Sequence, residues 1–203
     1  MWDRAIVLVS VLVLGSFLVG CQTYAVRAMP QISALEAPSK TSSYEVDFGV
    51  KPYTEEAQIQ AVFNYDMMSK GVMPVYLVVE NHSDYEMEML RMRVELRTAS
   101  GSVLAPVSPA VAVSGHGRNA AAEAFWLLGM ISYDDANKYN EALKRDWAEK
   151  AWPEISILAP GRTKAGFMYF NVGENYKQDG SRLTVKFDLD SLQGGREAVL
   201  PLR

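Results

Sequence analysis

Apolar and polar side chains alternate in several short segments between residues 44 and 203, and these segments predict β-strands. In 44–50, 90–97 and 183–189 every second residue is apolar, which is the period of a half-buried strand. Residues 75–79 are continuously apolar, are preceded by Pro74 and end in a polar turn, which predicts a central strand. The pattern therefore indicates a mostly β protein.

Two breaks in the alternation refine this prediction. The apolar side chains of 87–89 and 90–97 are out of phase, and a β-bulge near Met89 and Leu90 would reconcile them. Prolines follow residues 103–104, which favours an edge strand because such a strand tolerates missing amide donors. Seven or so short strands of this kind are typical of an immunoglobulin-like β-sandwich.

Helical periods interrupt the strands twice. Thr54 and two glutamates precede a short apolar segment, which predicts a helix over about 57–63. Residues 119–129 are alanine-rich and apolar, and a second, amphipathic helix follows from Ser132 until Pro153 stops it. We therefore expect an α-helical hairpin inserted in the sandwich at about 117–152.

The first 20 residues have the pattern of an export signal. An apolar run from Ala5 to Val19 follows a short polar start, and it is shorter than the roughly 20 residues that span a bilayer as a helix. It ends in Leu18-Val19-Gly20-Cys21, which resembles the lipobox of bacterial lipoproteins. This resemblance implies cleavage before Cys21 and lipidation of its thiol, where several acyl chains anchor a protein stably. The alternatives are a signal peptide that is cut elsewhere and an uncleaved apolar anchor. Cys21 is the only cysteine, so no intramolecular disulfide competes for it.

The remaining chain divides into a tether and a domain. Residues 21–43 are rich in Ala, Ser, Pro and Thr without sustained periodicity, which predicts a flexible tether. The β-sandwich domain is expected over 44–203. Gln22 follows the cysteine, where in enterobacteria-like sorting an aspartate would favour the inner membrane. Under those rules we expect the periplasmic face of the outer membrane, and the inner membrane and the cell surface are the alternatives.

Two segments flanking the predicted insertion resemble a family of uncharacterised bacterial envelope lipoproteins with an immunoglobulin-like sandwich. Residues 71–84 contain a strand that ends in the Asn-x-Ser turn of Asn81 to Ser83, and 158–170 contain a Pro-Gly turn before Gly166-Phe167-Met168-Tyr169-Phe170. The resemblance would extend from about Phe63 to Val172. It implies the sandwich fold and no particular activity.

Composition and charge exclude some classes of function. The chain has 203 residues and a formal net charge of −4, so no broad basic surface is available for nucleic acid. A carrier or sensor of a small envelope ligand, such as a glycan, a lipid or copper, is an alternative. Thioethers suit Cu(I), but a run of methionines on an inward strand side is also ordinary core. The methionines in question are Met67, Met68, Met73, Met87, Met89 and Met92.

No catalytic, cofactor or metal site is predicted. The chain has only two histidines: His82 falls in a predicted turn, and His116 near Ser114 lies outside the known contexts of a hydrolytic triad. A hydrolase that uses His116 is thus a third hypothesis. The acids at 134–135 suit a helix start, and Asp188 and Asp190 lack the other ligands of a calcium loop.

The predicted hairpin is the one candidate working surface. It carries three of the four tryptophans, and tryptophan is frequent both at interface hot spots and at seams between a helix and a sheet. We favour the core position at such a seam, and a displayed hairpin that docks a partner is the alternative. The candidate partner-binding residues are Phe125, Trp126, Trp147 and Trp152. We therefore expect a non-enzymatic envelope lipoprotein, held at the membrane by lipidated Cys21, that binds a protein partner or supports an assembly.

Overall fold

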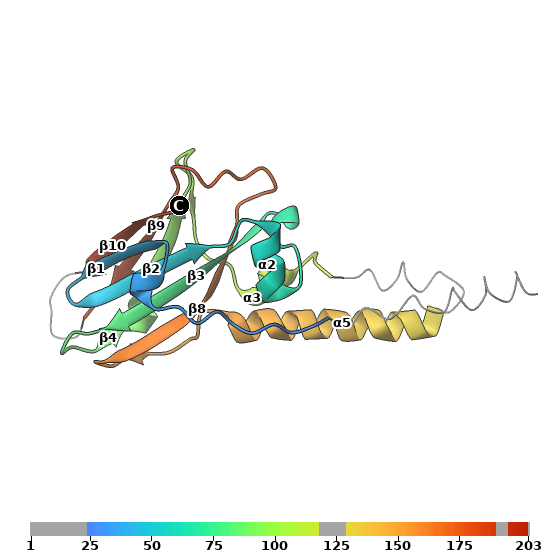
Figure 1. Cartoon of the computed structure of the whole chain (residues 1–203), viewed down its shortest axis with the longest axis horizontal. Helices are drawn as coiled ribbons and strands as arrows, with labels where there is room; N and C mark the ends of the chain where they lie inside the picture. The colour runs from blue at the N-terminus through green and yellow to red at the C-terminus, as the bar shows by residue number, and fades with distance from the viewer. Residues whose placement is uncertain (1–23, 118–128, 190–194, 203) are drawn as a thin grey trace, which may run out of the picture.

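The computed structural model describes residues 24–117, 129–189 and 195–202, and the side chains of 129–134 are not described (Figure 1). The predicted signal peptide 1–20, Cys21, Phe125 and Trp126 lie outside the described residues, as does nearly all of the first helix expected at 119–129.

Two four-stranded antiparallel sheets form a β-sandwich. The first sheet has the order β1-β2-β3-β8, with β1 (Ser39–Ser43), β2 (Val46–Pro52), β3 (Val72–Asn81) and β8 (Arg162–Asn171). The second has the order β10-β9-β5-β6, with β5 (Arg93–Arg97), β6 (Val103–Leu104), β9 (Arg182–Phe187) and β10 (Arg196–Pro201). A small two-stranded sheet joins β4 (Met87–Glu88) to β7 (Ile157–Leu158). The predicted mostly β sandwich is confirmed at this level.

Among the described residues, three α-helices lie beside the first sheet: α2 (Glu56–Phe63), α3 (Pro109–Val113) and α5 (Gly129–Lys150). Figure 1 shows α5 extending beyond the strands, with α2 and α3 near its C-terminal half. The short helix over about 57–63 and the second helix of the insertion are confirmed. The sequence did not predict α3, which begins at Ser108, whose side chain accepts from the Val111 amide at 3.3 Å, and at Pro109.

The first sheet is covered on both faces. Its inner face and the second sheet enclose one apolar cluster, which includes Phe48, Leu77, Phe170, Val185 and Phe187. Its outer face and the helices enclose a second cluster, which includes Ile59, Phe63, Trp147, Phe167 and Tyr169. This double burial explains why residues 75–79 are continuously apolar, since each face of β3 needs apolar side chains.

The predicted tether is wrong for its described part, residues 24–43. Tyr24, Ala34 and Ala37 are buried, and β1 pairs along its whole length with β2. Residues Ser39–Ser43 are all polar, so the hydrophobic pattern did not predict this strand. An edge strand pairs through its backbone and needs few apolar side chains. The domain therefore begins by Tyr24, and not near Tyr44.

The β1–β2 turn shifts the first predicted strand by two residues. Tyr44 and Glu45 have φ angles of 54° and 60°, so they form a two-residue hairpin turn. The alternation that starts at Tyr44 is thus part turn and part strand, and the strand itself begins at Val46.

The predicted β-bulge near Met89 and Leu90 is also wrong. A 3-10 turn, η3 (Met89–Arg91), separates β4 from β5. β4 pairs with β7, whereas β5 pairs with β9 in the second sheet. The change of phase therefore marks the point where the chain passes from one sheet to another.

Candidate functional site

Trp147, one of the candidate partner-binding residues, belongs to α5 and is fully buried between this helix and the first sheet. Its ring stacks on Tyr169 at 5.8 Å between centroids and meets the edges of Phe63 and His116. The Trp147 backbone carbonyl also accepts from the Tyr169 hydroxyl at 2.7 Å. Trp147 consequently cannot bind a partner, because the second apolar cluster already surrounds it.

Trp152 is only half-buried and remains accessible. Its backbone amide donates to the carbonyl of Phe167 at 2.8 Å, and Gly166 makes this close approach possible, because a Cβ there would lie 2.6 Å from the Cα of Trp152. Trp152 lines an open groove of about 460 Å³ together with Met89, Leu90, Met92, Ile155, Met168 and neighbouring residues. Leu90, at 70% exposed, is the most exposed large apolar side chain among the described residues.

The N-terminal segment is fixed to α5 by a buried polar network. The hydroxyl of Tyr24 donates toward Oδ2 of Asp146 at 2.5 Å and toward the backbone carbonyl of Phe63. Oδ1 of Asp146 pairs with Nζ of Lys150 at 2.5 Å, and this ammonium also donates to the Val62 carbonyl at 2.7 Å. In Figure 1 the segment that starts at residue 24 runs along α5 toward the strands.

Burial dominates the electrostatics of this network. Asp146 and Lys150 are almost fully buried as a pair. Loss of water lowers the pKa of Lys150, and the hydrogen bond to Asp146 opposes that shift. Burial raises the pKa of Tyr24, and the neighbouring carboxylate of Asp146 raises it further. The network holds a charged pair in an apolar layer, so each partner depends on the other.

The buried tyrosines predict that the domain loses stability at alkaline pH. Burial raises the pKa of Tyr53 to about 12 from an ordinary 10.0, and it also raises the pKa of Tyr76 and Tyr169. The unfolded chain releases these protons near pH 10 while the folded domain keeps them. The stabilisation is thus complete below pH 10 and is lost as the pH rises toward 12. The lowered pKa of Lys150 changes the stability in the opposite direction, because the folded domain releases this proton before the unfolded chain does. The three tyrosines together outweigh this single lysine.

Thermal melting between about pH 8 and 12 checks this prediction. The Tyr53→Phe variant keeps the ring and removes one ionisable group, so its stability should fall less steeply between pH 10 and 12. Equal slopes for the variant and the parent chain would contradict the assignment to Tyr53.

His116 lies against aromatic rings and not beside a nucleophile. Its Nδ1 is 3.2 Å from the backbone carbonyl of Ser114, whereas the Ser114 hydroxyl donates to the Val111 carbonyl at 2.6 Å. Burial lowers the pKa of His116. Its ring also packs on Trp147 and Tyr65. The structure therefore brings His116 close to Ser114 without the hydrogen bond between their side chains that a hydrolytic triad would need.

Most of the methionines considered for copper belong to the core. Met67, Met73 and Met87 are fully buried and Met89 nearly so. They are divided between the two apolar clusters on opposite faces of the first sheet. Of the six methionines, Met89 and Met92 line the groove beside Trp152. Met168, which was not among the six, lines it as well.

Asp47, Glu80 and His82 form a polar cluster that the sequence did not predict, at the end of the first sheet away from α5. His82 Nε2 lies 3.4 Å from Oδ2 of Asp47 and 3.4 Å from Oε2 of Glu80. Asp47 on β2 and Glu80 on β3 are direct cross-strand partners. His82 follows β3 by one residue, and its backbone amide donates to the Glu45 carbonyl at 2.8 Å in the β1–β2 turn. The three residues thus meet through strand register, although 35 positions separate the first from the last.

One signal in the sequence could have found this cluster. Asp47 is a polar residue between Val46 and Phe48 on a strand, and Glu80 ends the apolar run of β3. Pairing the ends of these two strands would have placed both carboxylates beside His82. The pairing of β2 with β3 across the α2 segment was the missing information.

Within the part of the chain that the structure describes, no helix is both long and apolar enough to cross a membrane.

Comparison with known proteins gives structural neighbours of unknown function. No family model matches the chain, and no curated protein sequence matches it. A functionally unknown protein from Listeria monocytogenes is 12% identical, with a TM-score of 0.40, over 93% of this chain and 95% of that one. A conserved hypothetical protein from Bacillus anthracis is 13% identical, with a TM-score of 0.35, over 86% of this chain and 94% of that one. An uncharacterized beta-sandwich protein from Clostridium difficile is 12% identical, with a TM-score of 0.33, over 86% and 97% of the two chains. The structural neighbours are thus uncharacterised bacterial proteins, one of them described as a β-sandwich, and none supplies an activity.

Proposed function

We propose that this chain is a bacterial envelope lipoprotein, anchored by lipid on Cys21, whose sandwich is a non-enzymatic module that binds a protein partner or supports an assembly. The support for the anchor is the segment Leu18-Val19-Gly20-Cys21 after an apolar run of signal-peptide length. The outer membrane is the proposed location, because Gln22 and not aspartate follows the cysteine.

The observation that carries this proposal furthest is the burial of Tyr24, three residues after Cys21. Three extended residues span at most about 11 Å. Because Tyr24 is fixed to α5 and α2, lipid on Cys21 would hold the domain directly against the bilayer and not at the end of a long tether. Such an anchor keeps the domain close to the bilayer and limits the orientations that it can take, which suits a module that presents one surface to a partner.

We propose further that the sandwich is immunoglobulin-like. With β2, β3 and β8 as strands A, B and E, and β5, β6, β9 and β10 as C, C′, F and G, the two sheets have the orders A-B-E and C′-C-F-G. These orders agree with that fold. On this assignment β1 is an added edge strand, and the helical segment lies between C′ and E.

Replacing Cys21 tests the anchor. In cells that process lipoproteins, the full chain should partition into the membrane and into the detergent phase, and mass spectrometry should find the acyl chains on an N-terminal Cys21. The Cys21→Ser variant should lose both properties, and a serine at the neighbouring Thr23 (Thr23→Ser) serves as the matched control. A Cys21→Ser chain that stays membrane-bound would refute lipidation and favour an uncleaved apolar anchor.

Affinity purification in gentle detergent tests the binding module. A partner should be recovered in constant ratio after cross-linking in intact cells, and the Trp152→Ala variant should recover less of it if the groove beside Trp152 takes part. Recovery of the chain as a lone monomer would count against the proposal. The alternative, a carrier of a glycan, lipid or copper, would then be tested by mass spectrometry of molecules that copurify with the chain.

A further inference from the structure

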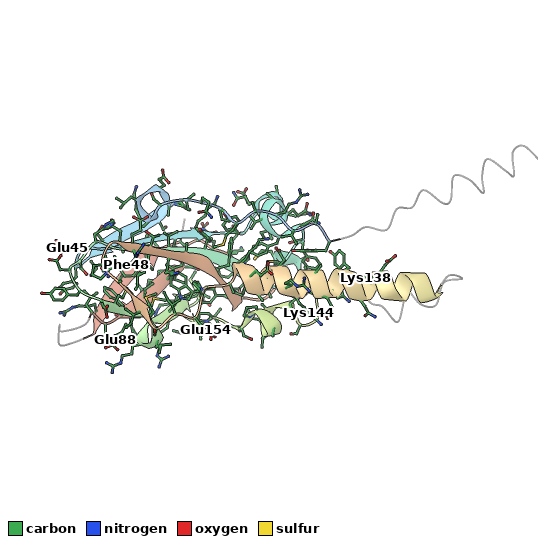
Figure 2. All side chains as sticks on the ribbon, turned by 90° about the horizontal axis from the view of Figure 1, so that it is seen from below. Glu45, Phe48, Glu88, Lys138, Lys144 and Glu154 are labelled. Atoms are coloured by element: carbon green, nitrogen blue, oxygen red, sulfur yellow. The ribbon has the colours of Figure 1, made fainter. Side chains whose placement is uncertain are left out.

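The cluster of Asp47, Glu80 and His82 lies in a row of polar side chains across the first sheet. Ser42 on β1 pairs with Asp47 on β2, Asp47 pairs with Glu80 on β3, and Glu80 pairs with Thr163 on β8. Directly paired residues project from the same face of a sheet. This face is the outer one, because the neighbouring side chains Val46, Phe48 and Val79 fill the core on the inner face. In Figure 2 the labels of Glu45 and Phe48 mark the end of the first sheet at which this cluster lies.

Each carboxylate is held by a second partner through the oxygen that does not face His82. Oδ1 of Asp47 accepts from the Ser42 hydroxyl, while its Oδ2 faces the imidazole. Oε1 of Glu80 accepts from the Ala34 amide at 2.9 Å, while its Oε2 faces the imidazole. Both carboxylate side chains are largely buried, at 13% and 14% exposed. Metal sites are commonly built in this way, with a second partner that orients each ligand.

We propose that Asp47, Glu80 and His82 bind a zinc ion through Oδ2, Oε2 and Nε2. Zinc binds carboxylate oxygen and imidazole nitrogen at about 2.0 to 2.2 Å. In a tetrahedron with bonds of that length, neighbouring ligand atoms lie about 3.3 to 3.6 Å apart. The two distances of 3.4 Å from Nε2 match that spacing. All three ligand atoms lie within 4.8 Å of one another, so a small closure about the ion completes the set.

The type of ligand favours zinc over the hard cations. Calcium takes six to eight oxygens, and magnesium prefers oxygen in near-ideal octahedral geometry. An imidazole nitrogen suits zinc and the later first-row ions. Three protein ligands leave one tetrahedral position for water, and His82, at 57% exposed, leaves the ion open to solvent on that side.

The ion would connect three parts of the fold. Asp47 belongs to β2, Glu80 to β3, and Glu80 in turn holds the amide of Ala34 in the N-terminal segment. Zinc binding would therefore strengthen the attachment of the N-terminal segment to the sheet at the end opposite the Tyr24 network. This inference does not depend on lipidation of Cys21, and either can fail alone.

Titration of the metal-free full chain in detergent with zinc chloride, followed by calorimetry, tests the site. We expect one zinc ion per chain and a higher melting temperature with zinc. Asp47→Asn, Glu80→Gln and His82→Ala should each weaken binding at least about tenfold, and Ser42→Ala should weaken it about tenfold. Cobalt(II) in place of zinc should give the intense visible absorption of tetrahedral coordination.

The Glu95→Gln variant is the matched control, since Glu95 pairs with Lys186 at 3.4 Å on the second sheet, away from the cluster. It should bind zinc as the parent chain does. The melting temperatures of the metal-free variants show that each remains folded. Absence of saturable binding would overturn the proposal, as would zinc binding that Asp47→Asn and Glu80→Gln leave unchanged. Displacement of zinc by an equal concentration of calcium would overturn the choice of metal.

Discussion

Replacing Trp147 with alanine should lower the free energy of unfolding by about 3 to 5 kcal/mol. The indole is fully buried between α5 and the first sheet, in contact with Phe63, Tyr169 and His116. Its removal leaves a cavity that the rings around it cannot fill without leaving the positions set by β8 and α2. Chemical denaturation of the purified chain measures the change.

Trp152→Ala provides the comparison for this prediction. Trp152 is the same residue type five positions later, but it is half-buried at the edge of the sandwich core. Its replacement should lower the free energy of unfolding clearly less than the replacement of Trp147 does. If the two variants lose similar stability, the second apolar cluster is less tightly packed than the structure indicates.

The Lys150→Met variant should be destabilised by about 3 to 5 kcal/mol, because it leaves Asp146 as an uncompensated buried charge. Methionine keeps the volume and the apolar stem of lysine, so lost packing contributes little. The variant also removes the ammonium from the Val62 carbonyl. Urea denaturation near neutral pH measures the loss, and increased proteolysis after residues 24–33 would show release of the N-terminal segment.

A double variant separates the charge from the packing. Asp146→Asn combined with Lys150→Met removes both charges and keeps a polar group beside the Tyr24 hydroxyl. The double variant should be more stable than Lys150→Met alone, since a neutral pair avoids the cost of an unpaired buried ion. If it is less stable, the buried charge of Asp146 is not the source of the cost.

The periodicity of apolar side chains predicted the strands and helices that have one face in an apolar core and the other face in solvent. β9 alternates because Leu183, Val185 and Phe187 enter the core while Lys186 faces solvent. α5 was predicted because Leu143 and Trp147 recur at helical spacing on one face. In both, one strand or helix meets one apolar layer, and its own sequence contains that information.

The structure differs from the prediction where tertiary partners decide. Residues 24–43 lack apolar periodicity, yet backbone pairing with β2 and the buried hydrogen bonds of Tyr24 order them. The apolar side chains change phase near Met89 because the chain passes from one sheet to another. The alternation pattern alone cannot distinguish such a passage from a β-bulge. The apolar face of α5 predicts that Trp147 is buried, but the sequence does not say that this face packs on the first sheet.

The candidate zinc site also depends on tertiary partners that the sequence pattern does not specify. His82 was interpreted as a turn residue, and no cluster of ligands was predicted. Its partners lie on two strands whose register brings Asp47 opposite Glu80. Periodicity assigns a residue to a face but does not say which strand lies beside it, so the cluster became visible only with the sheet order. Lipidation of Cys21 stays a prediction from the sequence.

The packed N-terminal segment also determines how the domain would resist tension. A pull on the chain before Tyr24 would first load the hydrogen bonds of Tyr24 to α5 and α2, and next the contacts of Ala34 with Gly49 and Glu80. Beyond these, β1 is hydrogen-bonded to β2, and the Ser39 hydroxyl donates to the Pro201 carbonyl on β10 in the other sheet. The mechanical load is thus divided in sequence among the helices, the first sheet and the second sheet, and no single contact carries it.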